Sequence, residues 1–407
     1  MPSALFLTQR IPYPPTKGEK IRSYRVLMHL RKSFDVHLGC LVDDPDDEQH
    51  VATVEALCAG SHVARIDRRR AKLTCLTGLL TGDALSVTFY RDRALQAWVD
   101  RTRRDIRPDA IVVLSSNMAP YVLQPGAERV RLCDLVDVDS EKWRAYAQTG
   151  KPPMSLVHRR EWHRVAALEA RIAQDFDWST FVSNDEAALF QSLVPTASAK
   201  IRAIPNGVDA DYFDPAIPRD PPFAPHFAHH RPRFVFTGTM DYPPNVDAAR
   251  WFARDILPLI HRDQPHAHFH IVGANPTPDI RALQSDTVHV TGRVADIRPY
   301  IAHASVCVAP MRIARGIQNK VLEALAMARP TVVTSDALEG IDATPGRDLL
   351  LANDPAAFAA ACLVALRPES AALGHAARTL VARDYAWGRR LAGFDPLLAD
   401  PFLAAPR

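Results

Sequence analysis

Residues 304–335, ASVCVAPMRIARGIQNKVLEALAMARPTVVTS, contain the pattern that decides the fold. The runs ASVCVAP (304–310) and PTVVTS (330–335) are short, apolar and rich in β-branched residues, which predicts two buried strands. Between them, NKVLEALAMA (319–328) has the composition and spacing of a helix. Strands that alternate with helices in this way indicate a parallel sheet with helices on both faces.

The loop before this helix gathers groups that bind anions. Free backbone N–H groups and the positive end of the helix dipole attract phosphate at a helix N-terminus. Gly316 lets the backbone approach a ligand closely, while Arg315 and Lys320 add positive charge. We therefore predict a phosphate site at residues 315–320, with Glu323 one turn into the helix. The loop and helix start also include Ile317, Gln318 and Asn319, and a purely structural cap is the alternative for them.

The same alternation runs through both halves of the chain, and 407 residues are too many for one ordinary core. The first half has strand-like runs at 3–8, 35–42, 110–116, 129–137, 179–183 and 201–206, with helical patterns at 20–32 and 139–176. The second half has strand-like runs at 233–238, 268–273, 287–292, 304–310 and 330–335. We expect two Rossmann-like, doubly wound α/β domains facing across a cleft, with ligands beyond the carboxyl ends of the strands.

The expected boundaries follow from composition. Residues 1–208 form the N-terminal domain, and residues 209–232, rich in proline and histidine, form a linker. Residues 233–383 form the C-terminal domain. Residues 384–407 form a C-terminal helix and tail that returns toward the N-terminal domain.

Bulk properties exclude several classes of protein. A net charge of +3 is too small for a nucleic-acid binder. No apolar run reaches the roughly 18 residues that span a bilayer, and the N-terminal residues do not resemble a signal peptide. The six cysteines are scattered, which predicts neither a zinc site nor disulfides, and the 16 histidines form no ligand motif. We expect a cytoplasmic protein without metal or cofactor.

Four motifs together resemble a known family. They are IPNGVDADYF (204–213), FTGTMDYPPNVDA (236–248), VHVTGRVADIRPYIAHASVCVAP (288–310) and RGIQNKVLEALAMARPTVV (315–333). Across essentially its whole length the chain resembles the retaining GT-B glycosyltransferases of family four (glycosyl transferases group 1). With LVDVDSEKW (135–143), it looks like the sugar transferases associated with exosortase (PEP-CTERM) and exopolysaccharide loci. The resemblance implies a nucleotide-sugar donor on the C-terminal domain, an acceptor on the N-terminal domain, retention of configuration and no metal.

The resemblance also assigns roles at the helix start. The glutamate at the position of Glu323 bonds the donor ribose hydroxyls in the family. The family has another glutamate eight positions earlier, where this chain has Arg315, and many relatives carry a cation in the loop that is MDYPPN (240–245) here. We therefore expect Arg315 and Lys320 to neutralise the leaving diphosphate, with Glu323 as the third catalytic residue. Solvent-facing side chains are the alternative.

Further positions match the donor side of the family. Gly238 and Thr239 follow the first strand of the C-terminal domain, where we expect the phosphates. The backbone of Gly292, Arg293 and Val294 is expected at the nucleobase. Lys17 and Gly18 occupy the place of a Gly-Gly loop that meets phosphate and acceptor, although Glu19 replaces the second glycine. A plain turn at a strand end is the alternative in each case.

The acceptor side is less defined. Asp137 and Asp139 form a D-x-D motif, which in GT-A enzymes holds a metal, but the two-domain repeat favours contacts with acceptor hydroxyls. Residues 112–121 lack the histidine that relatives place there, so no general base is evident. RRRAKLTCLTGLLTG (68–82) has basic residues before an apolar helical stripe, which suits peripheral contact with an anionic inner membrane and a lipid-linked acceptor. A core helix with a basic flank is the alternative.

Three rival functions were weighed. A sugar-nucleotide epimerase shares the fold but usually needs carboxylates and histidines that this chain lacks. An NAD oxidoreductase needs G-x-G-x-x-G after the first strand, which LTQRIPYPPTKG (7–18) does not supply. A non-catalytic binding protein would account for the missing family glutamate and histidine. The expected function is transfer of a hexose-type sugar to a glycan acceptor.

Overall fold

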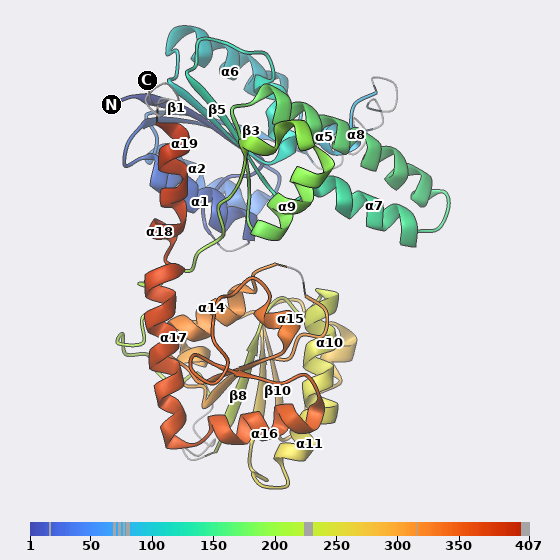
Figure 1. Ribbon diagram of the computed structural model, residues 1–407, viewed down its shortest axis with the longest axis vertical. Helices are drawn as coiled ribbons and strands as arrows, with labels where there is room; N and C mark the ends of the chain where they lie inside the picture. The colour runs from blue at the N-terminus through green and yellow to red at the C-terminus, as the bar shows by residue number, and fades with distance from the viewer. Residues whose placement is uncertain are drawn as a thin grey trace. The chain divides into compact units, whose positions relative to one another are not determined.

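The chain forms two compact units (Figure 1). The computed structural model describes residues 1–15, 18–67, 71, 75, 78, 82–223, 231–314 and 316–399. The first unit comprises residues 1–205 and the segment from Leu391 onward, and the second comprises residues 206–390. Each is built on one parallel sheet, so the predicted architecture of two Rossmann-like domains is confirmed.

The first unit has a sheet of seven strands in the order β3-β2-β1-β4-β5-β6-β7. Its strands are β1 (Ser3–Thr8), β2 (Asp35–Val42), β3 (Gly60–Arg65), β4 (Ala110–Leu114), β5 (Val130–Val136), β6 (Trp178–Phe181) and β7 (Ile201–Ala203). Its helices are α1 (Gly18–Leu30), α2 (Val51–Glu55), α5 (Leu85–Phe89), α6 (Arg93–Asp105), α7 (Asp139–Thr149), α8 (Met154–Asp175), α9 (Asn184–Leu193) and α19 (Asp395–Leu398).

The second unit has six strands in the equivalent order, β10-β9-β8-β11-β12-β13. They are β8 (Arg233–Thr237), β9 (His268–Val272), β10 (Val288–Gly292), β11 (Val306–Ala309), β12 (Thr331–Val333) and β13 (Leu350–Leu351). The longer helices are α10 (Pro243–Trp251), α14 (Asn319–Ala326), α16 (Pro355–Ala365) and α17 (Ala371–Asp384). Shorter helices are α11 (Leu257–Ile260), α12 (Pro278–Arg281), α13 (Arg298–Ala302), α15 (Ser335–Leu338) and, at the boundary between the units, α18 (Trp387–Leu391). Figure 1 shows α14 and α17 on one side of this sheet and α10 and α11 on the other.

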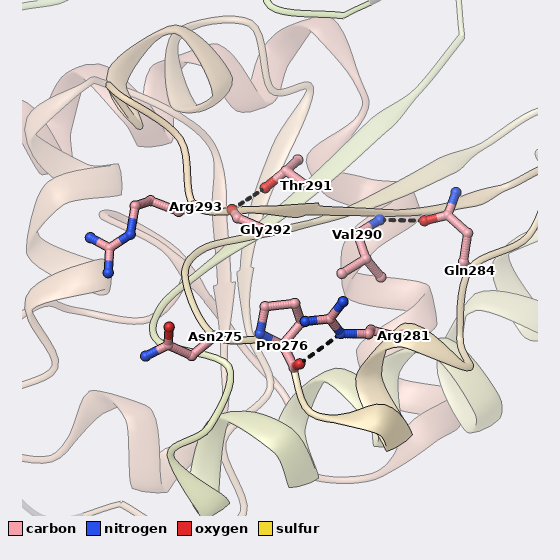
Figure 2. A pocket seen from close by; sticks show the side chains of 8 residues that line it. All are labelled: Asn275, Pro276, Arg281, Gln284, Val290, Thr291, Gly292 and Arg293. Atoms are coloured by element: carbon pink, nitrogen blue, oxygen red, sulfur yellow. Dashed lines mark hydrogen bonds between the residues drawn. The ribbon is translucent and has the colours of Figure 1, made fainter.

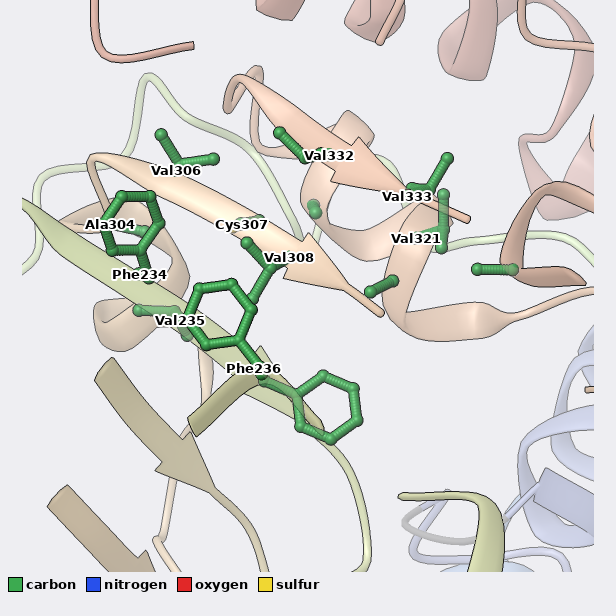
Figure 3. Close-up of a cluster of buried hydrophobic side chains, with 14 of the residues drawn as sticks. Phe234, Val235, Phe236, Ala304, Val306, Cys307, Val308, Val321, Val332 and Val333 are labelled. Carbon is green, nitrogen blue, oxygen red and sulfur yellow. The ribbon is translucent and has the colours of Figure 1, made fainter. Parts of the chain in front are cut away.

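The central strands of the second unit have continuously apolar sequences because both of their faces are buried. Val306 of β11 pairs with Phe234 of β8 in parallel register, and both side chains are completely buried. Figure 3 shows these strands with Val321 of α14 and Val332 of β12 in one cluster. Because helices cover both faces, neither face of these strands needs polar residues.

Three features of the chain differ from the sequence pattern. The helical pattern at 139–176 is two helices, because Pro152 and Pro153 interrupt it between α7 and α8. Helix α10 gives way to a π-helical turn, Phe252–Ile256, before α11, although residues 245–260 have the pattern of a single helix. The edge strands β3 and β13 were not predicted.

The segment interpreted as a linker packs on the second unit where it is described. Phe213 is buried in the core of that unit. The ring of Phe223 lies 5.6 Å from that of Tyr300 and 4.4 Å from that of His270, measured between centroids. Much of the remainder of this segment, residues 224–230, lies outside the described residues.

Within the described ranges, no single helix has both the length and the apolar character to cross a membrane. One helix pair, Pro355–Ala365 with Pro368–Asp384, meets that test only when joined across a 90° bend.

Candidate functional site

Both sheets change direction of winding between two neighbouring strands, which is where ligands of doubly wound sheets bind. In the first sheet these strands are β1 and β4, and in the second they are β8 and β11. Predicted site residues lie at the carboxyl ends of both pairs. Each unit is described by itself below.

In the second unit the ends of β8 and β9 approach each other closely. The Gly238 N–H donates to the Val272 carbonyl at 3.0 Å. A Cβ on Gly273 would lie 1.7 Å from the Gly238 oxygen, so only glycine fits there. The backbone can therefore turn away from β8 at Gly238. The next residue, Thr239, has an exposed side chain.

Asn245 connects this turn to helix α14. Its side chain is 3% exposed, its Nδ2 donates to the Thr239 carbonyl at 2.8 Å, and its Oδ1 accepts from Lys320 Nζ at 2.6 Å. The Lys320 ammonium also lies 5.1 Å from the centroid of the Phe236 ring. Burial lowers the pKa of Lys320 to about 8, although nearby Glu323 opposes this shift. No carboxylate of the described chain lies within ion-pair distance of it.

Glu323 lies one turn further along α14. The side chain is half-buried, and burial raises its pKa to about 7, with Lys320 acting in the opposite direction. Among the described residues its carboxylate has no hydrogen-bond or ion-pair partner. The buried Oδ1 of Asn319 also lacks a partner there. Within the described chain, this helix start therefore presents a lysine with no carboxylate partner, a carboxylate with no partner and an amide oxygen with no partner.

The loop before α14 is shaped by Gly316. Its φ of +66° favours glycine, whereas a Cβ would meet nothing within 4 Å, so conformation rather than space selects the residue. Gln318 donates from Nε2 to the Gly316 carbonyl at 3.1 Å, and Ile317 packs against the core of the unit. Arg315 lies outside the described residues.

The end of β10 borders a pocket of about 470 Å³. Figure 2 shows Asn275 and Arg293 on one side of it and Gln284 on the other. Gly292 lines this pocket with φ +68°, and Val294 follows, half-buried. The Val290 N–H donates to Gln284 Oε1 at 2.8 Å. The pocket lining is thus mainly backbone and exposed polar side chains.

The first unit has its own pocket, of about 380 Å³, at the carboxyl ends of β1, β4 and β5. Asp137 and Asp139 both line it. The other polar and aromatic lining residues are Gln9, Arg10, Glu19, Ser86, Tyr90, Ser115, Ser116, Asn117, Lys142 and Trp143. Gly18 is the first residue of α1, and Lys17 lies outside the described residues.

Two residues of this pocket have strained backbones. Ser115, directly after β4, has φ +81°, and Val136, the last residue of β5, has φ +72°. A positive φ costs about 1–3 kcal/mol for such residues, most of all for a β-branched one. Strain of this kind is concentrated at functional sites, which makes this pocket a candidate.

Carboxylates dominate the electrostatics of the pocket. Desolvation, with repulsion from Glu186 and Asp139, raises the pKa of Asp137 to about 6 even though the side chain reaches solvent. Desolvation also raises the pKa of Asp139, which Lys142 opposes from 3.9 Å. Below them Glu169 is 1% exposed, and burial raises its pKa to about 8. With a pKa of about 6, Asp137 is mostly ionised at neutral pH and can accept hydrogen bonds.

The structure does not group the D-x-D aspartates for metal binding. Within the described chain, no three His, Cys, Asp or Glu side chains are arranged to hold a metal ion. All six cysteines are free, with four of them buried.

Sequence reasoning missed Asn245 and Trp143. Asn245 lies within a recognised motif, but only its burial reveals that it binds Lys320, which is 75 residues away. Trp143 was part of a quoted motif as well, and its place in the pocket depends on where α7 begins.

Residues 231–367 match the family described as Glycosyl transferases group 1. No curated protein was found that matches the chain by sequence. Its fold is similar to that of sucrose-phosphate synthase from Thermosynechococcus elongatus, with 17% identity, a TM-score of 0.68 and 100% of each chain covered.

Two further solved structures have the same fold. The UDP-forming α,α-trehalose-phosphate synthase from Burkholderia xenovorans has 15% identity and a TM-score of 0.64, covering 98% of this chain and 99% of that one. Anabaena Alr3699/HepE in complex with UDP and glucose has 13% identity and a TM-score of 0.62, covering 98% and 100%. The second unit therefore contains a glycosyl transferases group 1 domain, in a chain that has the GT-B fold.

Proposed function

We propose that this chain is a glycosyltransferase that moves a hexose-type sugar from a nucleotide diphosphate sugar to a glycan acceptor. The observation that carries the proposal is the start of α14, where, among the described residues, Lys320 binds an amide but no carboxylate, and the Asn319 Oδ1 and the Glu323 carboxylate have no partner. It lies within the segment that matches glycosyl transferases group 1. A ligand with a diphosphate and a ribose would supply the missing partners of all three.

The donor has a matching place for each of its parts. Its diphosphate lies beside Lys320 and the N–H groups at the start of α14, where Arg315 adds charge. Glu323 accepts from the two ribose hydroxyls. The nucleobase lies against the backbone of 292–294, and Gly238 and Thr239 contact the phosphates. HepE, which has the same fold, binds UDP.

The acceptor binds in the pocket of the first unit. Asp137 and Asp139 accept hydrogen bonds from its hydroxyls, and Trp143 offers a face for a sugar ring. Lys17, and Gly18 at the start of α1, are the residues of the first unit that we propose to meet both substrates. The acceptor we propose is a lipid-linked glycan at the cytoplasmic side of the membrane. The biological role we propose is exopolysaccharide or cell-surface glycan synthesis of the exosortase-associated kind.

The reaction exchanges one bond at the anomeric carbon for another. The bond to the donor diphosphate breaks, and a bond to an acceptor hydroxyl forms on the same face, with retention. The leaving diphosphate takes the hydroxyl proton, which would explain why no general base is evident in the sequence. Lys320 and Arg315 stabilise the charge that develops on the diphosphate, without a metal.

A panel of UDP- and GDP-sugars, assayed with a membrane extract as the acceptor source, tests this function. We expect transfer from at least one donor, and loss of transfer in Glu323→Gln but not in Glu339→Gln, which changes an exposed glutamate of the same unit. Conversion of a nucleotide sugar without acceptor would instead identify an epimerase. Tight donor binding with neither hydrolysis nor transfer would indicate a non-catalytic binding protein.

A further inference from the structure

Helices α7 and α8 form a hairpin in the first unit (Figure 1). Its end, residues 144–159, is called the hairpin tip below. From Arg144 to Met154 every residue is exposed except Ala147, which is half-buried.

The tip combines cations with exposed apolar side chains. Between residues 142 and 160 the chain has five cations, Lys142, Arg144, Lys151, Arg159 and Arg160, and no carboxylate. Three of these cations are ion-paired, Lys142 with Asp139, Arg144 with Glu141 and Arg160 with Glu161, so the cations of this stretch without an ion-pair partner among the described residues are Lys151 and Arg159. Tyr146, Met154 and Leu156 are 45%, 52% and 64% exposed in the same stretch.

The base of the hairpin adjoins the pocket of the first unit. Asp139, Lys142 and Trp143, from the first half of α7, line that pocket. Helix α7 has 11 residues and is roughly 16 Å long at about 1.5 Å per residue, so its far end, in the tip, lies about 9 Å beyond Trp143 along the helix axis. A lipid-linked acceptor in the pocket could therefore have its lipid in a membrane that the tip contacts.

The hairpin also contacts part of the segment 68–82. Arg160 donates from one terminal nitrogen to the carbonyls of Gly78 and Asp83, at 2.6 and 3.0 Å. The greater part of 68–82, including its three arginines, lies outside the described residues. Its described part lies against α8, beside the cationic tip.

We propose that the hairpin tip docks on an anionic lipid surface. Exposed apolar side chains beside unpaired cations fit the boundary between acyl chains and acidic headgroups. Among the described residues neither Lys151 nor Arg159 has an ion-pair partner, so both are available to phosphate headgroups. An acidic protein would use the cations but would leave Met154 and Leu156 in water.

Co-sedimentation of the full chain with vesicles tests the charge. Vesicles of phosphatidylcholine alone are compared with vesicles that also contain phosphatidylglycerol. We expect binding to the anionic vesicles only, and about thirty-fold weaker binding for Lys151→Gln with Arg159→Gln. The control is Arg93→Gln with Arg101→Gln, two exposed arginines of α6, which should bind as the unaltered chain does.

A second variant tests the apolar contribution. Met154→Ser with Leu156→Ser should bind anionic vesicles at least about ten-fold more weakly. Ile106→Ser with Leu193→Ser changes two residues of the same unit, each 46% exposed, and should have no effect. Equal thermal melts of all variants exclude misfolding.

Three outcomes would overturn the proposal. They are absence of binding to anionic vesicles, equal binding to neutral ones, and tip variants that bind like their controls. If sedimentation velocity shows self-association that the tip variants abolish, the surface is an interface between two copies and the lipid assignment is wrong. Because vesicle binding needs neither donor nor acceptor, failure here leaves the proposed transferase activity untouched.

Discussion

Glu323→Gln should stabilise the protein at pH 8 while it weakens donor binding. Burial raises the pKa of Glu323 from 4.5 to about 7, so the folded state disfavours its ionised form. The cost of ionisation is absent below pH 4.5, grows as the pH rises to about 7, and is complete above it. Glutamine has no charge to bury and avoids this cost.

The pKa values bound the size of the effect. At about 1.4 kcal/mol per pKa unit, the shift from 4.5 to about 7 corresponds to a ceiling of about 3.5 kcal/mol. Partial exposure of the side chain reduces this, so we expect about 1–2 kcal/mol. For a unit of this size that is roughly 2–6 °C in Tm at pH 8, and only a small part of it at pH 5.

Differential scanning calorimetry at pH 5 and pH 8 measures the effect. Glu339→Gln, at an exposed position of the same unit, should show the same Tm as the unaltered chain at both values. Titration with nucleotide diphosphates should show binding about 10–100-fold weaker for Glu323→Gln, because hydrogen bonds to a charged group are lost. If Glu323→Gln lowers the Tm at pH 8, or shifts it equally at both pH values, the carboxylate has a partner and the reasoning fails.

Three further variants address the other parts of the site. Lys320→Met should lower the rate of sugar transfer by about 10²–10³-fold, because the charge that stabilises the leaving diphosphate is lost. Asp137→Asn should raise the KM for the acceptor about ten-fold at pH 7, and should remove a pH dependence centred near the side chain's pKa of about 6, both seen in initial rates. Gly273→Ala should destabilise the second unit by at least about 2 kcal/mol in urea, because its Cβ would lie 1.7 Å from the Gly238 oxygen; an unchanged midpoint would show that the two strand ends can separate.

The central strands of the fold were predictable, as were the edge strands β7 and β10, but the edge strands β3 and β13 were not. The strands β1, β2 and β8 have continuous apolar runs because neighbours or helices cover them on every side. In contrast, β3 is half-buried except at Ala64 and Arg65, and β13 has only two residues. The helical charge pattern also continues across the break between α7 and α8, so periodicity alone does not reveal the break.

The site was predictable where it is local in sequence. The start of α14 can be recognised because a glycine, an amide and a cation precede an apolar helix within a few residues. The bond between Asn245 and Lys320 joins residues 75 positions apart, and nothing in either local sequence announces it. The strained backbones of Ser115 and Val136 are equally hidden, because neither position holds a glycine and Val136 is a β-branched residue within a strand.

Lys320 in the second unit and Asp137 in the first are both unfavourable for folding when charged, one as a buried cation and the other as a carboxylate among carboxylates. At the start of α14 burial lowers the pKa of a lysine that is paired with an amide, and in the first unit it raises the pKa of Asp137 among other carboxylates. Folding alone would favour replacing these groups by neutral ones. A diphosphate would neutralise Lys320, and sugar hydroxyls would donate to Asp137. Each proposed ligand would therefore offset the free-energy cost of the charged group that binds it. Stability gained on replacement and binding lost on replacement should therefore occur together at these positions. A variant that separates the two effects would show that the residue serves the fold and not the ligand.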